Sequence, residues 1–305
     1  MEKILITGAS GQIGSELTMA LRKNYGNENV FATDLKEAPQ DVMESGPFQK
    51  LDVLDIQALT EFTAKNKISQ VYHLAALLSG TAEKKPLFAW DVNMKGLLYM
   101  LELAKETGLK RLFWPSSIAV FGRTTPKVST PQLTITEPNT VYGISKLAGE
   151  RWCEYYFNRY KVDVRSIRYP GLISYKTEAG GGTTDYAVEI FYDAIKQKAL
   201  PMMFMDDAIN CTIKLMEADS SKISIRSSYN LGGISFDPKE IAAEIKKHIP
   251  EFEITYKPDF RQAIAESWPK SIDDSIAKKD WECEYVYDLA KMTKVMLEEV
   301  KKKLK

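Results

Sequence analysis

Tyr142 and Lys146, four residues apart in the stretch VYGISK, are the first candidates for chemistry in this sequence. A spacing of four places both side chains on one face of a helix. A lysine ammonium beside a phenol favours the phenolate, and a tyrosine tuned in this way can act as a general base near neutral pH. An ordinary helix pair has the same spacing, so the two residues predict catalysis only in combination with other features.

Ser116 and Ser117 supply the next feature, because they end the apolar segment RLFWPSS that precedes this helix. Doubly wound parallel sheets bind their ligands at the carboxyl ends of strands. A hydroxyl at that place can hold a substrate oxygen while its proton leaves. Neighbouring residues of a strand face opposite ways, so only one of the two serines points into the crevice. We favour Ser117, with Ser116 as the alternative.

The stretch TGASGQIG places Gly8, Gly11 and Gly14 between an apolar segment and a helical one. Glycines allow a pyrophosphate to approach the backbone and the amides at a helix N-terminus. A tight turn that only packs helix against strand is the alternative. Asp34 ends the segment VFATD twenty residues after Gly14. Its carboxylate suits ribose hydroxyls and repels a 2′-phosphate, so the sequence predicts NAD rather than NADP.

A further acidic site occurs in LDVLD, after the third apolar segment. Asp52 and Val53 are placed there to flank the adenine ring of the cofactor, with the carboxylate near its amino edge. Asp52 is equally suited to form a turn at the end of a strand. The sequence leaves both roles open.

The elements that must hold these residues alternate between short β-branched segments and longer helical patterns, which predicts βαβ units. We expect an α/β protein with a Rossmann-type doubly wound parallel sheet. The expected strands are residues 3–8, 30–34, 48–55, 70–77, 111–117 and 163–170, with a charged loop between the second and third. The expected helices are residues 12–26, 56–66, 87–108 and 141–160.

The pattern becomes less regular after Pro170, with expected strands at 227–233 and 251–260 and a helix at 237–250. We expect residues 1–170 to form an NAD-binding Rossmann domain to which parts of the later chain return. Residues 171–305 would then form a smaller, interwoven substrate-binding lobe.

Charge and composition exclude several functions for the 305 residues. Lysine plus arginine total 41, as do aspartate plus glutamate, and the only block of like charge is the terminal KKKLK. Nucleic-acid and membrane-surface proteins gather a basic excess on one face, so neither partner is expected. No apolar segment reaches membrane-spanning length, and no leader pattern is present. We expect a cytoplasmic protein, although a transit peptide removed beforehand would leave no trace.

Cys153, Cys211 and Cys283 are widely spaced and match no zinc pattern, so no metal site is expected. An odd number of cysteines leaves one unpaired if two were bridged, and a reducing compartment is the simplest explanation. His73, in VYHLAA, is expected to pack at a strand end rather than to titrate in catalysis.

The sequence resembles the extended short-chain dehydrogenase/reductase superfamily over essentially the whole chain. The resemblance rests on four features together: TGxxGxxG, the acid after the second strand, the serine before VFG, and YxxxK. The resemblance implies that Tyr142 is the base, that Lys146 lowers its pKa and binds the nicotinamide ribose, and that Ser117 orients the substrate. It also assigns residues to the surroundings of the NAD: Gln12, Ile13, Leu74, Ala75, Ala76, Asn93, Tyr169 and Pro170.

Within the superfamily, four stretches resemble the short-chain type of L-threonine 3-dehydrogenase. They are HLAALLSG, PSSIAVFG, RYPGLISYKTEAGGGTTDYA and LPMMFMDDA. This implies oxidation of the L-threonine β-hydroxyl to 2-amino-3-oxobutanoate, with a hydride passing to NAD. The implied substrate contacts are Ser79, Gly182, Thr183 and Thr184, with Ser117 and Tyr142, and Trp268 is a candidate pocket wall.

One departure from the family pattern lies between Gln197 and Leu200. Relatives carry a longer connection there, whereas only two residues intervene in this chain. A helix does not readily reverse into a sheet strand within two residues, so we expect that a segment is missing here.

Two other functions use the same features. A nucleotide-sugar epimerase or dehydratase has the same site, but it would need a larger second lobe with basic residues for a diphosphate. A non-catalytic NAD-sensing regulatory protein would be expected to lack Tyr142 or Lys146, and both are present. The helical segments 87–106 and 145–160 carry more aromatic and leucine surface than one sheet face would cover, so a homodimer is expected.

Overall fold

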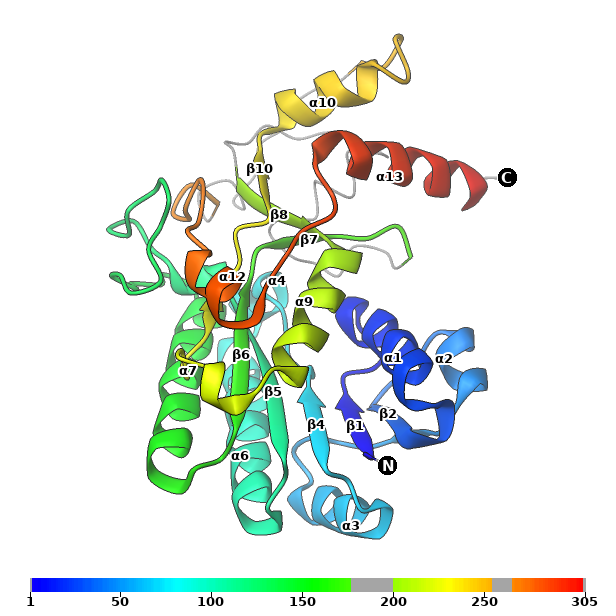
Figure 1. Cartoon of the computed structure of the whole chain (residues 1–305), viewed down its shortest axis with the longest axis vertical. Coiled ribbons are helices and arrows are strands. Elements are labelled where there is room, and N and C mark those ends of the chain that lie inside the picture. Colours follow the sequence, from blue (N-terminus) through cyan, green and yellow to red (C-terminus); the bar gives the residue numbers. More distant parts are fainter. Residues whose placement is uncertain (1, 177–199, 254–264, 304–305) are drawn as a thin grey trace.

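The computed structural model describes residues 2–176, 200–253 and 265–303. Its larger sheet, within those residues, has seven parallel strands in the order β3-β2-β1-β4-β5-β6-β9 (Figure 1). The strands are β1 (Ile4–Thr7), β2 (Val30–Asp34), β3 (Phe48–Lys50), β4 (Gln70–His73), β5 (Arg111–Ser117), β6 (Val164–Tyr169) and β9 (Tyr229–Asn230). This is the doubly wound sheet that the sequence predicts, with one added edge strand from the later chain.

The strand order reverses between β1 and β4, which pair with each other at the centre of the sheet. Successive connections therefore leave toward opposite faces at this point, and doubly wound sheets bind their ligands in the crevice expected there, above the carboxyl ends of the strands. The glycine stretch follows β1 and the stretch Leu74–Ala76 follows β4, so both border the crevice.

Helices cover both faces of the sheet because its residues alternate between two hydrophobic clusters. Ile4 and Ile6 face one cluster, and Leu5 between them faces the other. The first face is covered by α1 (Gln12–Tyr25), α2 (Gln40–Ser45), α9 (Met205–Glu217) and α12 (Ser275–Trp281). The second face is covered by α3 (Ile56–Asn66), α6 (Gly96–Thr107) and α7 (Val141–Tyr160).

Several expected elements differ from the structure. The charged loop contains α2, and the third strand ends at Lys50 because Asp52 turns the chain and Asp55 caps α3. The long helix expected over 87–108 is divided into α5 (Pro86–Trp90), a π-helical turn (Asp91–Lys95) and α6. Another short helix, α4 (Ser79–Lys84), precedes it. Single π turns within a helix are frequent at functional sites, and this one contains Asn93.

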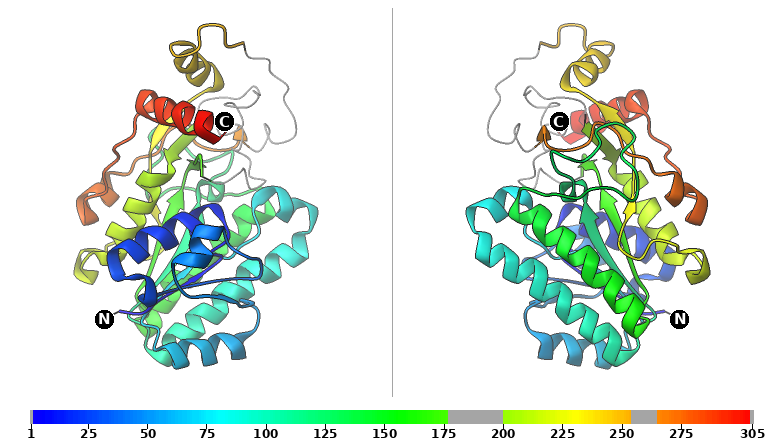
Figure 2. Two further views of the ribbon diagram at one scale, coloured as in Figure 1. Left: turned by 90° about the vertical axis from the view of Figure 1, so that its right-hand side faces the viewer. Right: turned by 90° about the vertical axis from the view of Figure 1, so that its left-hand side faces the viewer.

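A second unit lies at the end of the large sheet where the carboxyl ends of its strands point (Figure 2). It contains a small sheet in the order β10-β8-β7, built from β7 (Gly171–Ile173), β8 (Leu200–Phe204) and β10 (Ile234–Phe236). The helices α10 (Pro238–Lys246) and α13 (Leu289–Lys303) share its hydrophobic cluster. Residues 251–253 do not form the expected strand, and its remainder lies outside the described residues.

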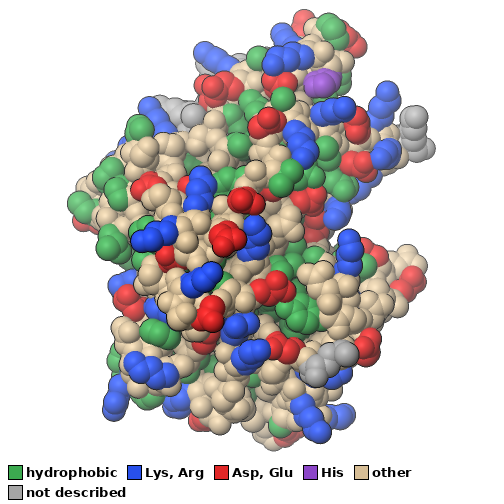
Figure 3. Space-filling model, viewed as in Figure 1, with side chains coloured by type: hydrophobic (Ala, Val, Ile, Leu, Met, Phe, Trp, Pro, Cys, Tyr) green, Lys and Arg blue, Asp and Glu red, His purple; other side chains and the backbone are tan. Residues whose placement is uncertain are grey.

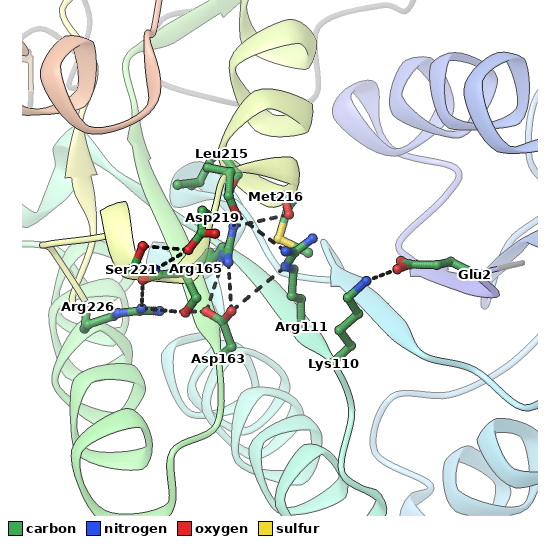
Figure 4. A network of polar contacts seen from close by, with 12 residues as sticks. Glu2, Lys110, Arg111, Asp163, Arg165, Leu215, Met216, Asp219, Ser221 and Arg226 are labelled. Atoms are coloured by element: carbon green, nitrogen blue, oxygen red, sulfur yellow. Dashed lines mark hydrogen bonds and ion pairs between the residues drawn. The ribbon is translucent and has the colours of Figure 1, made fainter.

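The opposite end of the large sheet is held by a cluster of charged residues around Asp163 (Figure 4). Arg165 and Arg226 each form an ion pair with this carboxylate, at 2.8 and 2.6 Å. Arg165 also donates to the carbonyls of Leu215, at 2.6 Å, and Ala218, at 2.8 Å. One arginine therefore satisfies carbonyls at the end of α9 and joins that helix to β6.

We predict that Asp163→Asn lowers the free energy of unfolding by about 3 kcal/mol at pH 7, because it leaves two buried guanidinium groups without a carboxylate. Denaturant unfolding measures this value. Glu37→Gln is the control, because its ion pair with Lys50 is 74% and 61% exposed and contributes less than about 1 kcal/mol.

The difference in the free energy of unfolding between the wild type and Asp163→Asn should depend on pH. Burial alone would raise the pKa of Asp163, but Arg165 and Arg226 hold that pKa below its ordinary value. A carboxyl with a depressed pKa stabilises the fold fully above its unfolded value of about 3.9, and this stabilisation is lost as pH falls through the folded value. The gap between the wild type and Asp163→Asn should therefore close in acid. A gap that stays constant down to pH 3 would contradict this account.

Candidate active site

The site is built where α7 lies directly against the end of β5. A Cβ on Gly143 would come within 2.2 Å of the Ala119 carbonyl oxygen, and one on Gly149 within 2.3 Å of the Trp114 ring. No other residue type fits at either position without moving α7. The two glycines therefore bring the face that carries Tyr142 and Lys146 onto the carboxyl end of β5.

The first turn of α7 is capped from two sides. The Thr140 hydroxyl accepts a hydrogen bond from the Gly143 amide at 3.0 Å, and the Glu83 carboxylate of α4 accepts one from the Val141 amide at 2.8 Å. These caps fix the direction in which Tyr142 leaves the helix. Sequence reasoning missed both groups, although a threonine directly before a helical pattern is a recognisable cap.

Tyr142 and Ser117 are hydrogen-bonded to each other through their side chains. Burial raises the pKa of Tyr142 to about 12, and the hydrogen bond from Ser117 acts in the opposite direction. Ser117 also accepts a hydrogen bond from the Ala119 amide at 3.2 Å, which begins a short turn (Ile118–Val120). The serine that the sequence favours is thus the one that contacts the tyrosine.

Ser116 belongs to a different set of contacts. Its hydroxyl donates to the Glu150 carboxylate at 2.7 Å, and the same carboxylate receives two hydrogen bonds from Arg168, at 2.7 and 2.8 Å. Arg168 donates in addition to Asn230 of β9 at 3.0 Å. This buried network joins α7 to three strands, and sequence reasoning did not identify it.

Lys146 is buried beneath Tyr142. Its Nζ donates to the Pro115 carbonyl at 2.6 Å, and lies 4.5 Å from the Trp114 ring centre and 5.4 Å from that of Tyr142. Burial lowers the pKa of Lys146 to about 7, against the opposing influence of Cys153 and Glu150. Burial thus favours the neutral forms of both the phenol and the amine, while each charged form would stabilise the other. The arrangement is suited to moving a proton.

The glycine stretch serves two purposes. A Cβ on Gly8, where φ is +77°, would lie 2.6 Å from the Ala75 amide nitrogen, and one on Gly14 would lie 2.0 Å from the Gly8 oxygen. These two glycines are required for close contact within the protein. Within the described residues, a Cβ on Gly11 would meet only the Gly8 oxygen, at 3.4 Å. Protein contacts do not explain Gly11, whereas a pyrophosphate against the start of α1 would.

The first residues of α1, Gln12 and Ile13, follow Gly11 directly, and within the described residues no side chain caps the start of this helix. Asp34 lies beside the glycine stretch at the end of β2. Its carboxylate accepts hydrogen bonds from the amides of Ser10, at 3.0 Å, and Lys36, at 3.1 Å. Glycine backbone, helix N-terminus and carboxylate therefore fit the phosphates and ribose of NAD.

Of the two roles that the sequence left open for Asp52, the structure shows the turn at the end of a strand. Its carboxylate accepts a hydrogen bond from the Leu54 amide at 2.9 Å. Val53 is buried in the cluster under α3 and α6.

The segment after β4 is held by Asn93 in the π-helical turn. The Asn93 side chain accepts from the Leu77 amide at 2.8 Å and donates to the Leu77 carbonyl at 3.1 Å. Both ends of the amide thus fix the segment that contains Leu74, Ala75 and Ala76. Through these two hydrogen bonds, Asn93 positions the backbone of the segment that follows β4.

His73 is completely buried, and burial lowers its pKa to about 3. Its Nδ1 lies 2.8 Å from the Thr7 hydroxyl. The imidazole is therefore neutral at physiological pH, as expected for a residue that packs at a strand end.

Tyr169 pairs in register with Ser117 across β5 and β6. Its hydroxyl is hydrogen-bonded to Thr212 of α9, and its ring is buried in the first cluster. The Tyr169 backbone and the buried Pro170 border the crevice, while the phenol is engaged below it.

The implied substrate residues come from three segments. Ser79 is buried at the start of α4, which packs against α7. Trp268 is buried in the cluster of the second unit, and Tyr142 packs against the same cluster. Gly182, Thr183, Thr184 and the shortened connection near Gln197 lie outside the described residues.

Charged side chains of both signs are interspersed over the face drawn in Figure 3. Within residues 2–176, 200–253 and 265–303, no cluster of three or more His, Cys, Asp and Glu residues is placed to bind a metal ion. In the same part of the chain, no helix has the length and apolar character needed to cross a membrane.

Comparison with known proteins places this geometry in a family. Residues 4–232 match the NAD dependent epimerase/dehydratase family. An uncharacterised epimerase/dehydratase of Staphylococcus haemolyticus is 51% identical over 315 residues, which cover 99% of each chain. This alignment is longer than the 305 residues of the present chain, so the relative has residues without a counterpart in it.

Two solved structures are similar over nearly their whole length. The holo form of a GalE-like L-threonine dehydrogenase from Cupriavidus necator has a TM-score of 0.95 and 53% identity, covering 98% of this chain and 99% of that one. An L-threonine dehydrogenase from Clostridium difficile has a TM-score of 0.95 and 50% identity, covering 99% and 98%. The present chain is therefore an enzyme of the NAD dependent epimerase/dehydratase family, within the extended short-chain dehydrogenases/reductases, and its cofactor is NAD.

Proposed function

We propose that this enzyme oxidises the β-hydroxyl of L-threonine to 2-amino-3-oxobutanoate with NAD. The observation that carries the proposal is the contact between Tyr142 and Ser117 above the buried Lys146, in a chain about half identical to two threonine dehydrogenases over nearly its full length. Threonine presents one hydroxyl on a carbon that can release a hydride, and this reaction needs one base and one hydride acceptor.

The chain supplies the proton chemistry. Ser117 donates a hydrogen bond to the substrate oxygen and Tyr142 removes its proton, so that the C–O bond can become a carbonyl as the Cβ hydride leaves. The base is the Tyr142 phenolate, which becomes the neutral phenol as it takes the proton, and the positive charge of Lys146 stabilises that phenolate before the transfer. NAD, when bound, accepts the hydride. The distance of 5.4 Å between the Lys146 Nζ and the Tyr142 ring centre supports this role.

We assign the cofactor contacts to the crevice residues. The stretch from Gly11 to Ile13 receives the pyrophosphate, and Asp34 receives the adenosine ribose hydroxyls, which excludes the 2′-phosphate of NADP. Leu74–Ala76, supported by Asn93, borders the nicotinamide side. Residues 1–170 form the NAD-binding domain, and residues 171–305 form the interwoven substrate-binding lobe.

We assign threonine recognition to Ser79 and Trp268 together with Gly182, Thr183 and Thr184. Hydroxyl and backbone donors suit the carboxylate of a small zwitterion, and a buried indole suits its methyl group. The three cysteines are unbridged, which fits an enzyme of threonine breakdown in the cytoplasm.

The first test is an assay for NADH formation. Incubation with NAD and L-threonine should generate NADH, whereas L-serine should react more slowly. Tyr142→Phe should lower kcat by about 100- to 10,000-fold, because it removes the base but leaves the ring. Conversion of a UDP-sugar without net NADH, together with no reaction of threonine, would assign the enzyme to the epimerases or dehydratases instead. Full turnover by Tyr142→Phe would refute Tyr142 as the base.

The second test separates the two serines by pH dependence. A base must be deprotonated, so log(kcat/KM) should rise with pH until the pKa of Tyr142 in the enzyme before threonine binds is reached. The hydrogen bond from Ser117 lowers the pKa of Tyr142. Ser117→Ala should therefore move the rising limb to higher pH, with a loss of about 10- to 100-fold in kcat/KM at pH 7.

Ser116→Ala is the matched control for this shift, because the Ser116 hydroxyl bonds to Glu150. It should leave the position of the limb unchanged. A shift caused by Ser116→Ala and absent from Ser117→Ala would reverse the two assignments.

We further propose that the enzyme is a homodimer that pairs through α5 and α7. These helices are in contact, and they expose large apolar side chains: Leu87 is 82% exposed, Phe88 55% and Tyr155 48%. An apolar surface shared by neighbouring helices is typical of a subunit interface.

Light scattering at micromolar concentration should give twice the chain mass, and Leu87→Glu combined with Tyr155→Glu should give a monomer. Leu133→Glu is the control, because Leu133 is 80% exposed and lies on neither helix. A monomeric wild type would contradict the dimer.

A further inference from the structure

Cys211 and Cys283 are 72 residues apart in the sequence, yet their sulfur atoms lie 3.0 Å from each other. Cys211 is on α9, and Cys283 follows the end of α12. Both are buried and unbridged. Cys153 is in the cluster on the other face of the large sheet, and Cys211 and Cys283 are both in the first cluster. Two thiols of the three are therefore paired by the fold.

The segment that contains Cys283, residues 282–287, runs along α9 and is called the strap below (Figure 1). The Lys214 ammonium donates to the Glu282 carbonyl at 2.9 Å. The Asp207 carboxylate accepts from the amides of Val286, at 2.9 Å, and Tyr287, at 3.0 Å. Asp207, Cys211 and Lys214 are spaced four and three residues apart on α9, so one face of the helix holds the whole strap.

The strap also connects the two units of the molecule. It leaves α12, which packs on the large sheet, and continues into α13 in the cluster of the second unit. α9 itself packs against β6 and α1. A covalent link between α9 and the strap would therefore restrain the second unit relative to the large sheet.

We propose that Cys211 and Cys283 are a modification site at which an oxidant such as hydrogen peroxide forms an intrachain disulfide, fastening the strap to α9. A disulfide has a sulfur–sulfur distance of about 2.05 Å, so the two atoms need to approach by about 1 Å. This is a small rotation of side chains that already face each other. This inference is independent of the substrate and of the roles given to Tyr142 and Lys146.

The first attack is assigned to Cys283, because this residue belongs to the strap, which lines a surface pocket with Lys278, and it keeps 1% of its surface exposed whereas Cys211 keeps none. Its thiolate attacks one peroxide oxygen and the O–O bond breaks, which gives a sulfenic acid and hydroxide; the hydroxide takes up the proton that the thiol released and becomes water. The Cys211 thiol then attacks this sulfur, the S–O bond breaks, and a second water leaves. Peroxide is reduced by two electrons and the two thiols are oxidised by two.

The second step, the attack by Cys211, should be slow. The hydrogen bond with Cys283 and burial both raise the pKa of the Cys211 thiol, which leaves little thiolate. The pair therefore differs from a fast peroxide sensor. It responds to sustained oxidation, and a reductant reverses it.

A thiol count on the wild-type protein tests the site directly. The full chain is treated with hydrogen peroxide while folded, the excess is removed, and thiols are titrated in denaturant. The count should fall from three to one and return to three after dithiothreitol. Peptide mass spectrometry should find Cys211 linked to Cys283 within one chain. A count that stays at three, or a link that contains Cys153, would overturn the proposal.

Two further measurements test the effect on the strap. Hydrogen exchange at the Val286 and Tyr287 amides should slow in the oxidised protein, and Tm should rise by roughly 5 °C. Cys153→Ser should keep both effects, whereas Cys211→Ser and Cys283→Ser should lose both. Unchanged exchange in a protein whose disulfide has formed would refute the restraint on the strap.

Discussion

The close approach of α7 to β5 is the constraint on which the rest of the site depends. Gly143 and Gly149 allow it because a side chain at either position would occupy atoms of β5 or of the turn that follows it. The approach has a consequence for polar groups, since Lys146 and Glu150 become buried with the helix. Buried charges are tolerated when they are paired and hydrogen-bonded, and Arg168, Ser116 and the Pro115 carbonyl provide these partners.

Burial also determines the charge of the reacting groups. An isolated phenol and amine would titrate near pH 10, whereas burial separates their pKa values to about 12 for Tyr142 and about 7 for Lys146. Both groups are then neutral between these two values. A positive cofactor ring and a substrate hydroxyl would therefore change the protonation of this pair more strongly than they would at an exposed site.

The glycine stretch illustrates how one motif meets structural and binding requirements together. Gly8 and Gly14 are fixed by contacts with Ala75 and with each other, which a turn without a ligand would also require. Gly11 lacks such a contact within the described residues, and it stands at the start of α1. The motif therefore supports cofactor binding through its middle glycine, while its outer glycines hold the sheet, the helix and the segment after β4 together.

The sequence by itself determined the features that depend on local spacing. The glycine triplet, Asp34 at the end of a strand, the i, i+4 pair Tyr142 and Lys146, and the six strands of the predicted sheet are each encoded within a few residues. Tertiary structure decided what depends on contacts between distant segments: the capping of α7 by Glu83, the network of Glu150, and the pairing of Cys211 with Cys283. Tertiary structure also decided which serine contacts Tyr142. Neighbouring residues of a strand point to opposite faces, but this rule does not say whether Ser116 or Ser117 is the one that faces Tyr142.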